Sequence, residues 1–190
     1  MTRFKKIAVA GAAALALALG AMAQPGHAED KNPMVGGAAM YANKNIVQNA
    51  MNSKDHTTLV AAVKAAGLVE TLQGKGPFTV FAPTNAAFEK LPPGTVETLL
   101  KPENKDKLKK ILTCHVVAAN AMSSAIMKMI KDDGGKHPVK TVGGCTFTAK
   151  MKGDKIVIVD GKGNEATVTI ANVKQSNGVI HVIDTVLLPG

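Results

Sequence analysis

The spacing of apolar residues predicts a mostly helical first half for this chain. From Leu59 to Ala66 the apolar positions recur three or four residues apart, and Gly67 follows where a left-handed terminal residue is favoured. Thr57 or Thr58 is expected to cap this helix, and Thr95 a later one. Similar spacing and end signals predict further helices in the stretches NIVQNAMN, LVETLQ, VETLL, ENKDKLKKIL and AMSSAIMKMIKDD.

After Cys114 the pattern changes to the alternation that is typical of strands. In ATVTIANV, the residues Ala166, Val168 and Ile170 fall on one face and threonines on the other. Strands are also predicted in HVVAA, VKTV, CTFTAKM, KIVIVD and GVIHVIDTVLLP, of which the last is expected to be the longest, with DGKGN as a hairpin turn. Helices that precede strands, rather than alternate with them, indicate an α+β fold: one domain with a sheet packed against several helices.

The stretch GPFTVFAPTNAAFEKLP, residues 76–92, passes from strand to helix within a few positions. Pro83 ends the strand because it has no N–H to donate to a neighbouring strand. Thr84 and Asn85 both carry side-chain oxygens that are able to cap the following helix. Phe88 and the apolar residues before Pro83 are expected to fill the core, so the stretch is interpreted as structural.

The N-terminal residues have the pattern of an export signal. Three basic residues precede an apolar run that ends in Ala21-Met22-Ala23, a small-x-small cleavage pattern. We therefore expect a signal peptide at 1–23. A cut after Ala28 and an uncleaved membrane anchor are the alternatives.

Residues 24–42 are rich in glycine, proline and alanine, and are expected to form a flexible leader. Residues 43–190 are then expected to form the domain, with a length that suits one sizeable core. The mature chain is expected to contain no membrane span, and to be a monomer or a weak oligomer, in a periplasm or secreted from the cell.

The charge balance bounds the class of partner. The formal net charge is +9, and removing the three basic residues of the signal leaves 9 − 3 = +6. This surplus permits a contact with an anionic polysaccharide or lipid headgroups but does not demand one. Nucleic acid is not expected as a partner, because the chain is exported, has no tryptophan and has one tyrosine, which gives no platform for stacking bases.

The two cysteines, Cys114 and Cys145, form an even pair in a chain that is expected to be exported. This indicates one disulfide, with two buried free thiols as the alternative. The bond would close a loop of about 30 residues, which the loop-entropy description values at about 3 kcal/mol.

The sequence offers little support for catalysis, and the chain is predicted not to be an enzyme. His181 and Asp184 lie three apart on a predicted strand, so they are expected to point to opposite faces. The adjacent pair Cys114-His115 fails as a dyad for the same reason, and the chain contains no Gly-x-Ser-x-Gly elbow. His115 and His181 are interpreted as hydrogen-bonded core or boundary residues.

No cofactor is expected. DGKGNEAT resembles a calcium loop only superficially, because Lys162 stands where a ligand oxygen is needed. Met122, Met127, Met129 and His137 could indicate a soft-metal site, for example for Cu(I), but methionines at helical spacing more often fill a core.

Two stretches, GPFTVFAPTNAAFEKLP and SNGVIHVIDTVLLP, resemble the two signature boxes of the fasciclin (FAS1) family. LTCHVV between them lies where that family has its central histidine-containing motif. The resemblance covers roughly residues 43–189 and is similar to the small secreted bacterial members, including the mycobacterial antigen type. It implies a compact domain with a β-wedge packed against helices, a role in adhesion or protein–protein contact outside the cytoplasm, and no catalysis.

The chain departs from the animal members of that family at two places. Cys114 stands where they have the tyrosine of a Tyr-His pair, although His115 remains, and Asn172-Val173 stands where they have Asp-Ile. Integrin-type recognition is therefore not carried over, and His115, Asn172 and Val173 are only positional candidates for a contact surface. The remaining residues of the boxes are expected to be structural, namely Thr84, Asn85, Phe88, Asn177, Gly178, His181 and Asp184.

Two function hypotheses follow from the sequence. The first is an exported, non-enzymatic module that binds a protein or polysaccharide of the cell surface or matrix. The alternative is a periplasmic carrier of a small ligand or of a metal such as copper.

Overall fold

The computed structural model describes residues 32–190, so the signal peptide expected at 1–23 lies outside the described residues. The second part of the expected leader, however, belongs to the folded domain. Strands β1 (Met34–Val35) and β2 (Ala38–Ala39) pair as an antiparallel hairpin, and the adjoining Met40 is buried. Sequence reasoning therefore placed the start of the domain too late, because glycine-rich composition hides the few apolar residues that the hairpin buries.

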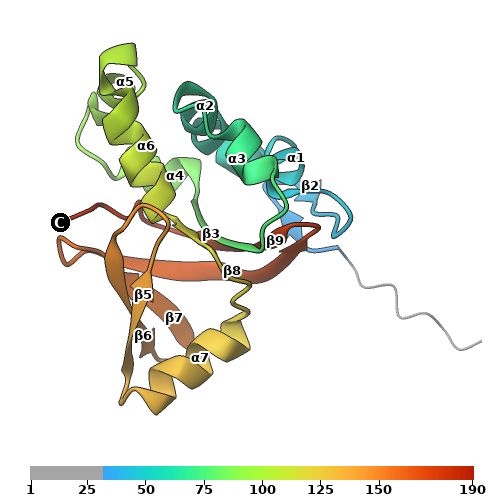
Figure 1. The fold of residues 1–190 in the computed structure, drawn as a ribbon, viewed down its shortest axis with the longest axis vertical. Helices are drawn as coiled ribbons and strands as arrows, with labels where there is room; N and C mark the ends of the chain where they lie inside the picture. Colours follow the sequence, from blue (N-terminus) through green and yellow to red (C-terminus); the bar gives the residue numbers. More distant parts are fainter. Residues whose placement is uncertain (1–31) are drawn as a thin grey trace, which may run out of the picture. The chain divides into compact units, whose positions relative to one another are not determined.

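Seven α-helices and two 3-10 turns cover the sheet among the described residues. The helices α1 to α6 lie together on one side of the sheet, and α7 lies on the opposite side (Figure 1). Their bounds are α1 Ile46–Ala50, α2 Thr57–Ala65, α3 Val69–Gln73, α4 Asn85–Glu89, α5 Thr95–Leu99, α6 Lys105–Cys114 and α7 Ser123–Asp132, with 3-10 turns at Lys54–His56 and Pro102–Asn104.

The large sheet has seven strands in the order β4-β3-β9-β8-β7-β6-β5. β3 and β9 run parallel, with Phe78 opposite Gly178 and Pro83 opposite Ile183, and all other neighbours are antiparallel. In Figure 1 β5 to β7 turn away from the central strands, so the sheet curves towards a barrel. The strands are β3 Phe78–Pro83, β4 Val116–Val117, β5 Lys136–Lys140, β6 Thr146–Lys152, β7 Lys155–Val159, β8 Glu165–Gln175 and β9 Gly178–Ile183.

The arrangement confirms the α+β expectation but corrects the last strand. β8, with eleven residues, is the longest strand, while β9 ends at Ile183. Beyond it the backbone turns to side-chain partners: Leu187 N–H donates to His115 Nε2 at 2.9 Å and Leu188 N–H donates to Asp160 at 2.9 Å. Val186 and Leu187 are therefore buried, and Leu188 is half-buried, without continuing the sheet.

Side chains on the two faces of the central strands pack into two separate hydrophobic cores. Val80 and Ala82 of β3 pack with the helices α1 to α6, whereas Phe81 between them packs inside the curved part of the sheet with Phe147 and Ile130. Successive strand residues point to opposite faces, so β3 and β9 are apolar at nearly every position. This explains the continuous apolar runs FTVFA and GVIHVI in the sequence.

Only one of the two expected caps of α4 acts on that helix. Thr84 is its N-cap and accepts a hydrogen bond from Ala87 N–H at 3.2 Å, as predicted. Asn85 is already helical, and its side-chain oxygen accepts instead from Thr58 N–H at 3.0 Å, at the start of α2. Its amide donates to Lys54 C=O at 2.9 Å.

The threonines expected to cap α2 and α5 do not do so. His56 is the N-cap position of α2 and Gly94 that of α5, and neither helix receives a side-chain cap from its own residues. Asn85 therefore supplies the cap that α2 lacks, and thereby fixes α2 to α4.

Asn177 and Gly178 connect β8 to β9 under tight constraints. The Asn177 side chain donates to Leu72 C=O at 2.8 Å and to Gly74 C=O at 2.9 Å, and accepts from Ile46 N–H at 3.1 Å. A Cβ on Gly178 would lie 1.9 Å from the Phe78 carbonyl oxygen, so only glycine fits there. The structural role expected for both residues is thus explained by their contacts.

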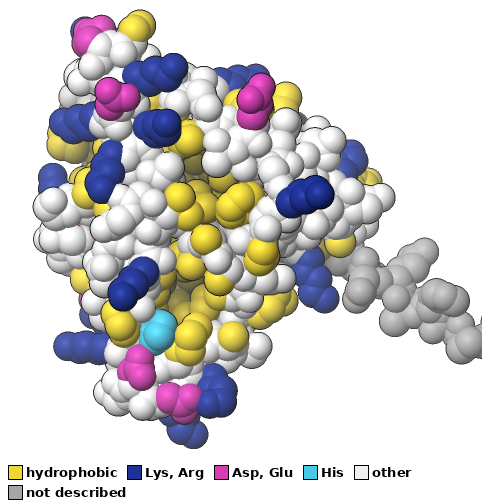
Figure 2. All heavy atoms as spheres, in the orientation of Figure 1, with side chains coloured by type: hydrophobic (Ala, Val, Ile, Leu, Met, Phe, Trp, Pro, Cys, Tyr) yellow, Lys and Arg dark blue, Asp and Glu magenta, His cyan; other side chains and the backbone are white. Residues whose placement is uncertain are grey.

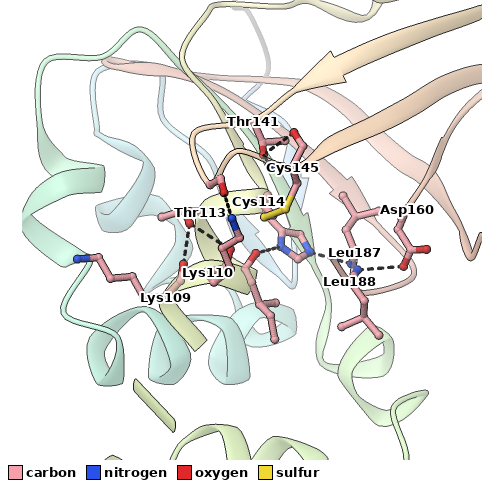
Figure 3. Close-up of a disulfide and its surroundings, with 12 residues drawn as sticks. Lys109, Lys110, Thr113, Cys114, Thr141, Cys145, Asp160, Leu187 and Leu188 are labelled. Carbon is pink, nitrogen blue, oxygen red and sulfur yellow. Dashed lines mark hydrogen bonds between the residues drawn. A yellow bond between two sulfur atoms is a disulfide. The ribbon is translucent and has the colours of Figure 1, made fainter. Parts of the chain in front are cut away.

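Cys114 and Cys145 form the disulfide that the sequence indicated, with their Cα atoms 5.5 Å apart. The bond joins the last residue of α6 to the residue before β6 (Figure 3). Next to it, Val142 N–H donates to Val116 C=O at 2.8 Å. Here the two edges of the sheet, at β4 and just beyond the end of β5, meet, so the curved sheet is joined at this end.

Removing the disulfide should lower the free energy of unfolding by about 3 kcal/mol, because a cross-link between residues 31 apart restricts the unfolded chain. The double variant Cys114→Ala/Cys145→Ala and the reduced wild type are compared with the oxidised protein by urea denaturation. Equal midpoints for the oxidised and reduced wild type would contradict this role of the bond.

Thr84→Ala should lower the free energy of unfolding by about 1 kcal/mol, and Asn85→Ala by about 2 kcal/mol because it leaves backbone groups of two elements without partners. Thr95→Ala is the matched control, since Thr95 gives no side-chain cap, and should change it by less than about 0.5 kcal/mol. Thermal and urea melts of the three variants test the order.

Candidate functional site

The three contact candidates from the sequence do not form an exposed surface. His115 is 2% exposed and Val173 is fully buried, so neither is able to touch a partner. Asn172 is half-buried. Position within a family motif therefore overestimated their accessibility, because His115 faces the core behind the disulfide and Val173 faces the helices.

His115 is held in one neutral form by backbone groups. Its Nε2 accepts from Leu187 N–H at 2.9 Å, so Nδ1 carries the proton and donates to Ile111 C=O at 2.9 Å. Burial lowers the pKa of this imidazole to about 4, since the charged form would lose its hydration and would face the Leu187 N–H. The ring therefore connects α6, through Ile111, to the segment that follows β9, through Leu187.

His181 and Asn172 fix the segment between β4 and α7. His181 Nε2 donates to Ala121 C=O at 2.8 Å, while Nδ1 accepts from Asn172 N–H at 3.3 Å. Asn172, at a bulge of β8 with φ of 62°, accepts from Ser123 N–H at 2.7 Å. Thr79 adds a further tie, since its hydroxyl bonds to Ala119 C=O and accepts from Ala121 N–H.

Among the described residues, these contacts do not bring His181 and Asp184 together. Asp184 accepts from Thr167 N–H at 2.8 Å, and both ring nitrogens of His181 are bonded to backbone groups, so the two residues form no dyad. Asp160 accepts from the N–H groups of Lys162 and Asn164 and thus closes the predicted hairpin turn between β7 and β8. Among the residues that the structure describes, no group of three or more His, Cys, Asp or Glu could hold a metal ion.

A buried Ser53–His56 pair is a feature that sequence reasoning missed. Ser53 Oγ lies 2.9 Å from His56 Nδ1, and both side chains are buried under the β1–β2 hairpin. The spacing i, i+3 in a 3-10 turn, which brings two side chains into line, was the available signal. The adjoining hollow holds about 20 Å³, room for about one water, which is too small for a substrate.

A larger hollow lies where the curved sheet remains open, and we call it the seam groove. One wall is the end of β4 and the segment that follows it, from which Val117, Ala119 and Ala121 line the hollow. The other wall is β5, through residues 137–140, and Phe81 belongs to the floor. The groove holds about 220 Å³.

The seam groove is bounded at both ends. At one end the disulfide and the Val142–Val116 backbone bond join the walls. At the other end α7 lies between the walls and contributes Ile126 and Met129. Figure 2 shows apolar side chains gathered in a hollow down the middle of this face, between β5 and the segment leading to α7 in Figure 1.

The rim of the seam groove is basic. Lys136 and Lys140 of the β5 wall are exposed, and neither has an acidic partner among the described residues. The nearby acids are engaged: Asp132 pairs with Lys128, and Asp133 lies 2.7 Å from His137 Nδ1. The rim therefore presents a net positive charge beside an apolar hollow.

The methionine and histidine residues considered for copper are divided by the fold. Met129 and His137 line the seam groove, whereas Met127 is exposed on α7 and Met122 is the N-cap position of that helix. Two candidate ligands thus share a site, but three or four are usual for a bound transition metal.

The stability of the domain should fall between pH 6.5 and pH 4. Below pH 6.5 the unfolded chain takes up a proton at His115, while the folded chain does not until its pKa of about 4, so acid favours unfolding. This loss is on the order of 3 kcal/mol at pH 4. Burial also lowers the pKa of His56 and of His181, which adds to the loss with the same sign.

Urea denaturation from pH 7.5 to pH 4.5 measures this slope. His115→Gln is the informative variant, because an amide is able to donate to Ile111 and accept from Leu187 but does not titrate. It should flatten the slope, and an unchanged slope would contradict the assignment.

Comparisons with known proteins agree with the geometry. The chain is 49% identical over 160 residues to Protein sll1483 of Synechocystis sp., covering 84% of this chain and 82% of that protein. It is 36% identical over 159 residues to the cell surface glycolipoprotein MPB83 of Mycobacterium bovis, covering 81% of this chain and 64% of that protein.

A solved structure shares the fold. It is a FAS1 domain pair from the insect cell adhesion molecule Fasciclin I, with a TM-score of 0.68 and 19% sequence identity. The match covers 76% of this chain and about half of that one, 51%. No helix in the described part of this chain is both long and apolar enough to cross a membrane. The profile of the Fasciclin domain family matches residues 54–189, and the chain belongs to this family.

Proposed function

We propose that this chain is exported, to a periplasm or to the extracellular medium, and acts there as a non-enzymatic interaction module. Its partner is a protein or a polysaccharide of the cell surface or matrix, and its contact surface is the seam groove. The groove is the observation that carries the proposal, because it combines apolar lining, open strand edges and a basic rim in one place.

The seam groove fits a macromolecular contact better than a small ligand. Pockets that enclose small molecules usually measure about 300 to 1,000 Å³, and the groove holds about 220 Å³. A few side chains of a larger partner would fill it. The two hollows beneath the helices hold about 20 and 30 Å³, room for about one water each.

The compartment is supported by two independent features. A disulfide persists in oxidising surroundings such as the periplasm or the extracellular medium. The basic and apolar pattern of residues 1–23 is typical of a signal peptide. One similar protein is named a cell surface glycolipoprotein, and the structure with the same fold comes from a cell adhesion molecule. A role at the cell surface is proposed for this chain by analogy with them.

The absence of catalysis is supported by the contacts of the histidines. His115 and His181 each use both ring nitrogens on backbone groups, so neither has a nitrogen to act as a base. The alternative, a periplasmic carrier of a small ligand or copper, keeps one supporting observation, because Met129 and His137 line the same groove.

Filling the seam groove should abolish attachment. A strain that lacks the protein is complemented with wild type, with Ala119→Trp, whose indole would occupy the groove, or with Ala118→Trp. Both alanines are exposed on the same segment, but only Ala119 lines the groove, which makes Ala118→Trp the matched control. Attachment to surfaces and to other cells is counted, with melting temperature as the check on folding.

The expected result is that wild type and Ala118→Trp restore attachment and that Ala119→Trp does not. If both variants restored attachment equally, the groove would not be the contact surface. No loss of attachment in the deletion strain would reject the module itself, and a stoichiometric copper content in the purified protein would favour the carrier.

A further inference from the structure

We propose that the partner places an extended peptide segment in the seam groove as an added strand, with apolar side chains at alternate positions and acidic residues at its ends. This inference rests on the proposed function, because it names the partner of the same groove. It commits to a peptide rather than a polysaccharide for reasons of shape, free backbone groups and charge.

One wall of the seam groove is a strand with an open edge, which gives the groove room for a strand beside it. On the other wall Val117, Ala119 and Ala121 line the hollow, and the chain bends at Ala118 and Ala119 after β4 ends. The opposite wall is the strand β5. The five residues of β5 span about 17 Å, so this wall accommodates a segment of about five residues in an extended conformation.

The edge of β5 supplies unpaired backbone groups. β5 is the last strand of the sheet and pairs only with β6. Among the described residues, no backbone hydrogen bond joins 136–140 to 117–121, whereas one joins Val142 to Val116 near the disulfide. An open edge of this kind is what an extended peptide uses when it adds a strand to a sheet.

The residues of β5 restrict which peptide is able to pair. Pro138 has no N–H, and Lys136 and Lys140 stand at the two ends of the strand, all of which discourage pairing between like edges. Two copies of β5 would bring four lysines together. An acidic peptide would instead neutralise Lys136 and Lys140, which have no acidic partners among the described residues.

The apolar lining of the groove determines which side chains fit in the central part of the peptide. Small residues, Ala119 and Ala121, leave room on one wall, while Met129 is able to adjust its flexible side chain at the end of the groove. Valine or isoleucine at alternate positions suits both the extended backbone and the lining. The expected ligand is thus an acid–apolar alternating–acid segment.

A random nine-residue peptide library, displayed on phage, tests the inference with the oxidised mature protein as bait. Selection on wild type, with Ala119→Trp as the counter-selection, should enrich alternating apolar residues flanked by Asp or Glu. Selection on Lys136→Glu/Lys140→Glu should enrich lysine or arginine flanks instead. Enrichment without alternation, or flanks that do not respond to the charge reversal, would overturn the inference.

Backbone pairing is tested with a synthetic peptide, DEVTVTVED, and fluorescence anisotropy. Two versions with N-methyl groups at odd or at even positions keep the side chains but lose half of the N–H donors each. At least one should bind ten-fold or more weakly, as should DEVTVTVED to Ala119→Trp, while Ala118→Trp stays within two-fold. If both methylated versions bind as well as the parent peptide, strand addition is wrong.

The outcomes separate this inference from the proposed function. If Ala119→Trp abolishes attachment in the cell but the library yields no alternating peptide, the module stands and its partner is not a strand; a glycan array would then be the next probe. If peptides bind as expected but attachment survives Ala119→Trp, the groove binds strands but the proposed function is wrong.

Discussion

The parallel pairing of β3 with β9 joins residues that lie 100 positions apart, since Phe78 is opposite Gly178. Closing so long a loop costs conformational entropy before any contact is made. Burial of both faces of the pair offsets this cost: Val80 and Ala82 pack under the helices, while Phe81 packs in the second core. Asn177 holds the same pair to α1 and α3 through three backbone groups. The pairing of β3 with β9 is therefore the element that the two hydrophobic cores share.

The opening in the curved sheet follows from what the chain inserts between its edges. After β4 the chain forms α7 before it returns as β5, and a helix of ten residues is about 15 Å long. The ends of the two walls are therefore kept apart at α7, whereas the disulfide holds them together at the other end. The apolar groove is thus a product of connectivity: the sheet is closed where the chain is cross-linked and open where the helix stands.

Local signals in the sequence predicted the parts of the fold that depend on local chemistry. The cap by Thr84, the glycine at position 178 and the cysteine pair each follow from a few neighbouring residues. Asn85 was assigned to the wrong helix because Thr58, its partner, is 27 residues away. The start of the domain was placed too late because the buried residues of the β1–β2 hairpin are few.

The proposed contact surface could not be predicted in the same way. Family position suggested His115 and Val173, which the core buries. The seam groove depends on the approach of residues 117–121 to residues 137–140, and no local pattern in either segment indicates that the two lie close together. The charges on its rim are visible in the sequence, but their lack of acidic partners appears only once Asp132 and Asp133 are seen to be engaged elsewhere.

The disulfide has a mechanical consequence for the seam groove. It joins the two walls covalently at one end, and α7 lies between them at the other end. A frame held at both ends changes its width little, so the domain loses little conformational freedom when the groove is filled. The entropy cost of association then falls mainly on the occupant, and an occupant that is already extended binds more tightly than a flexible one with the same side chains.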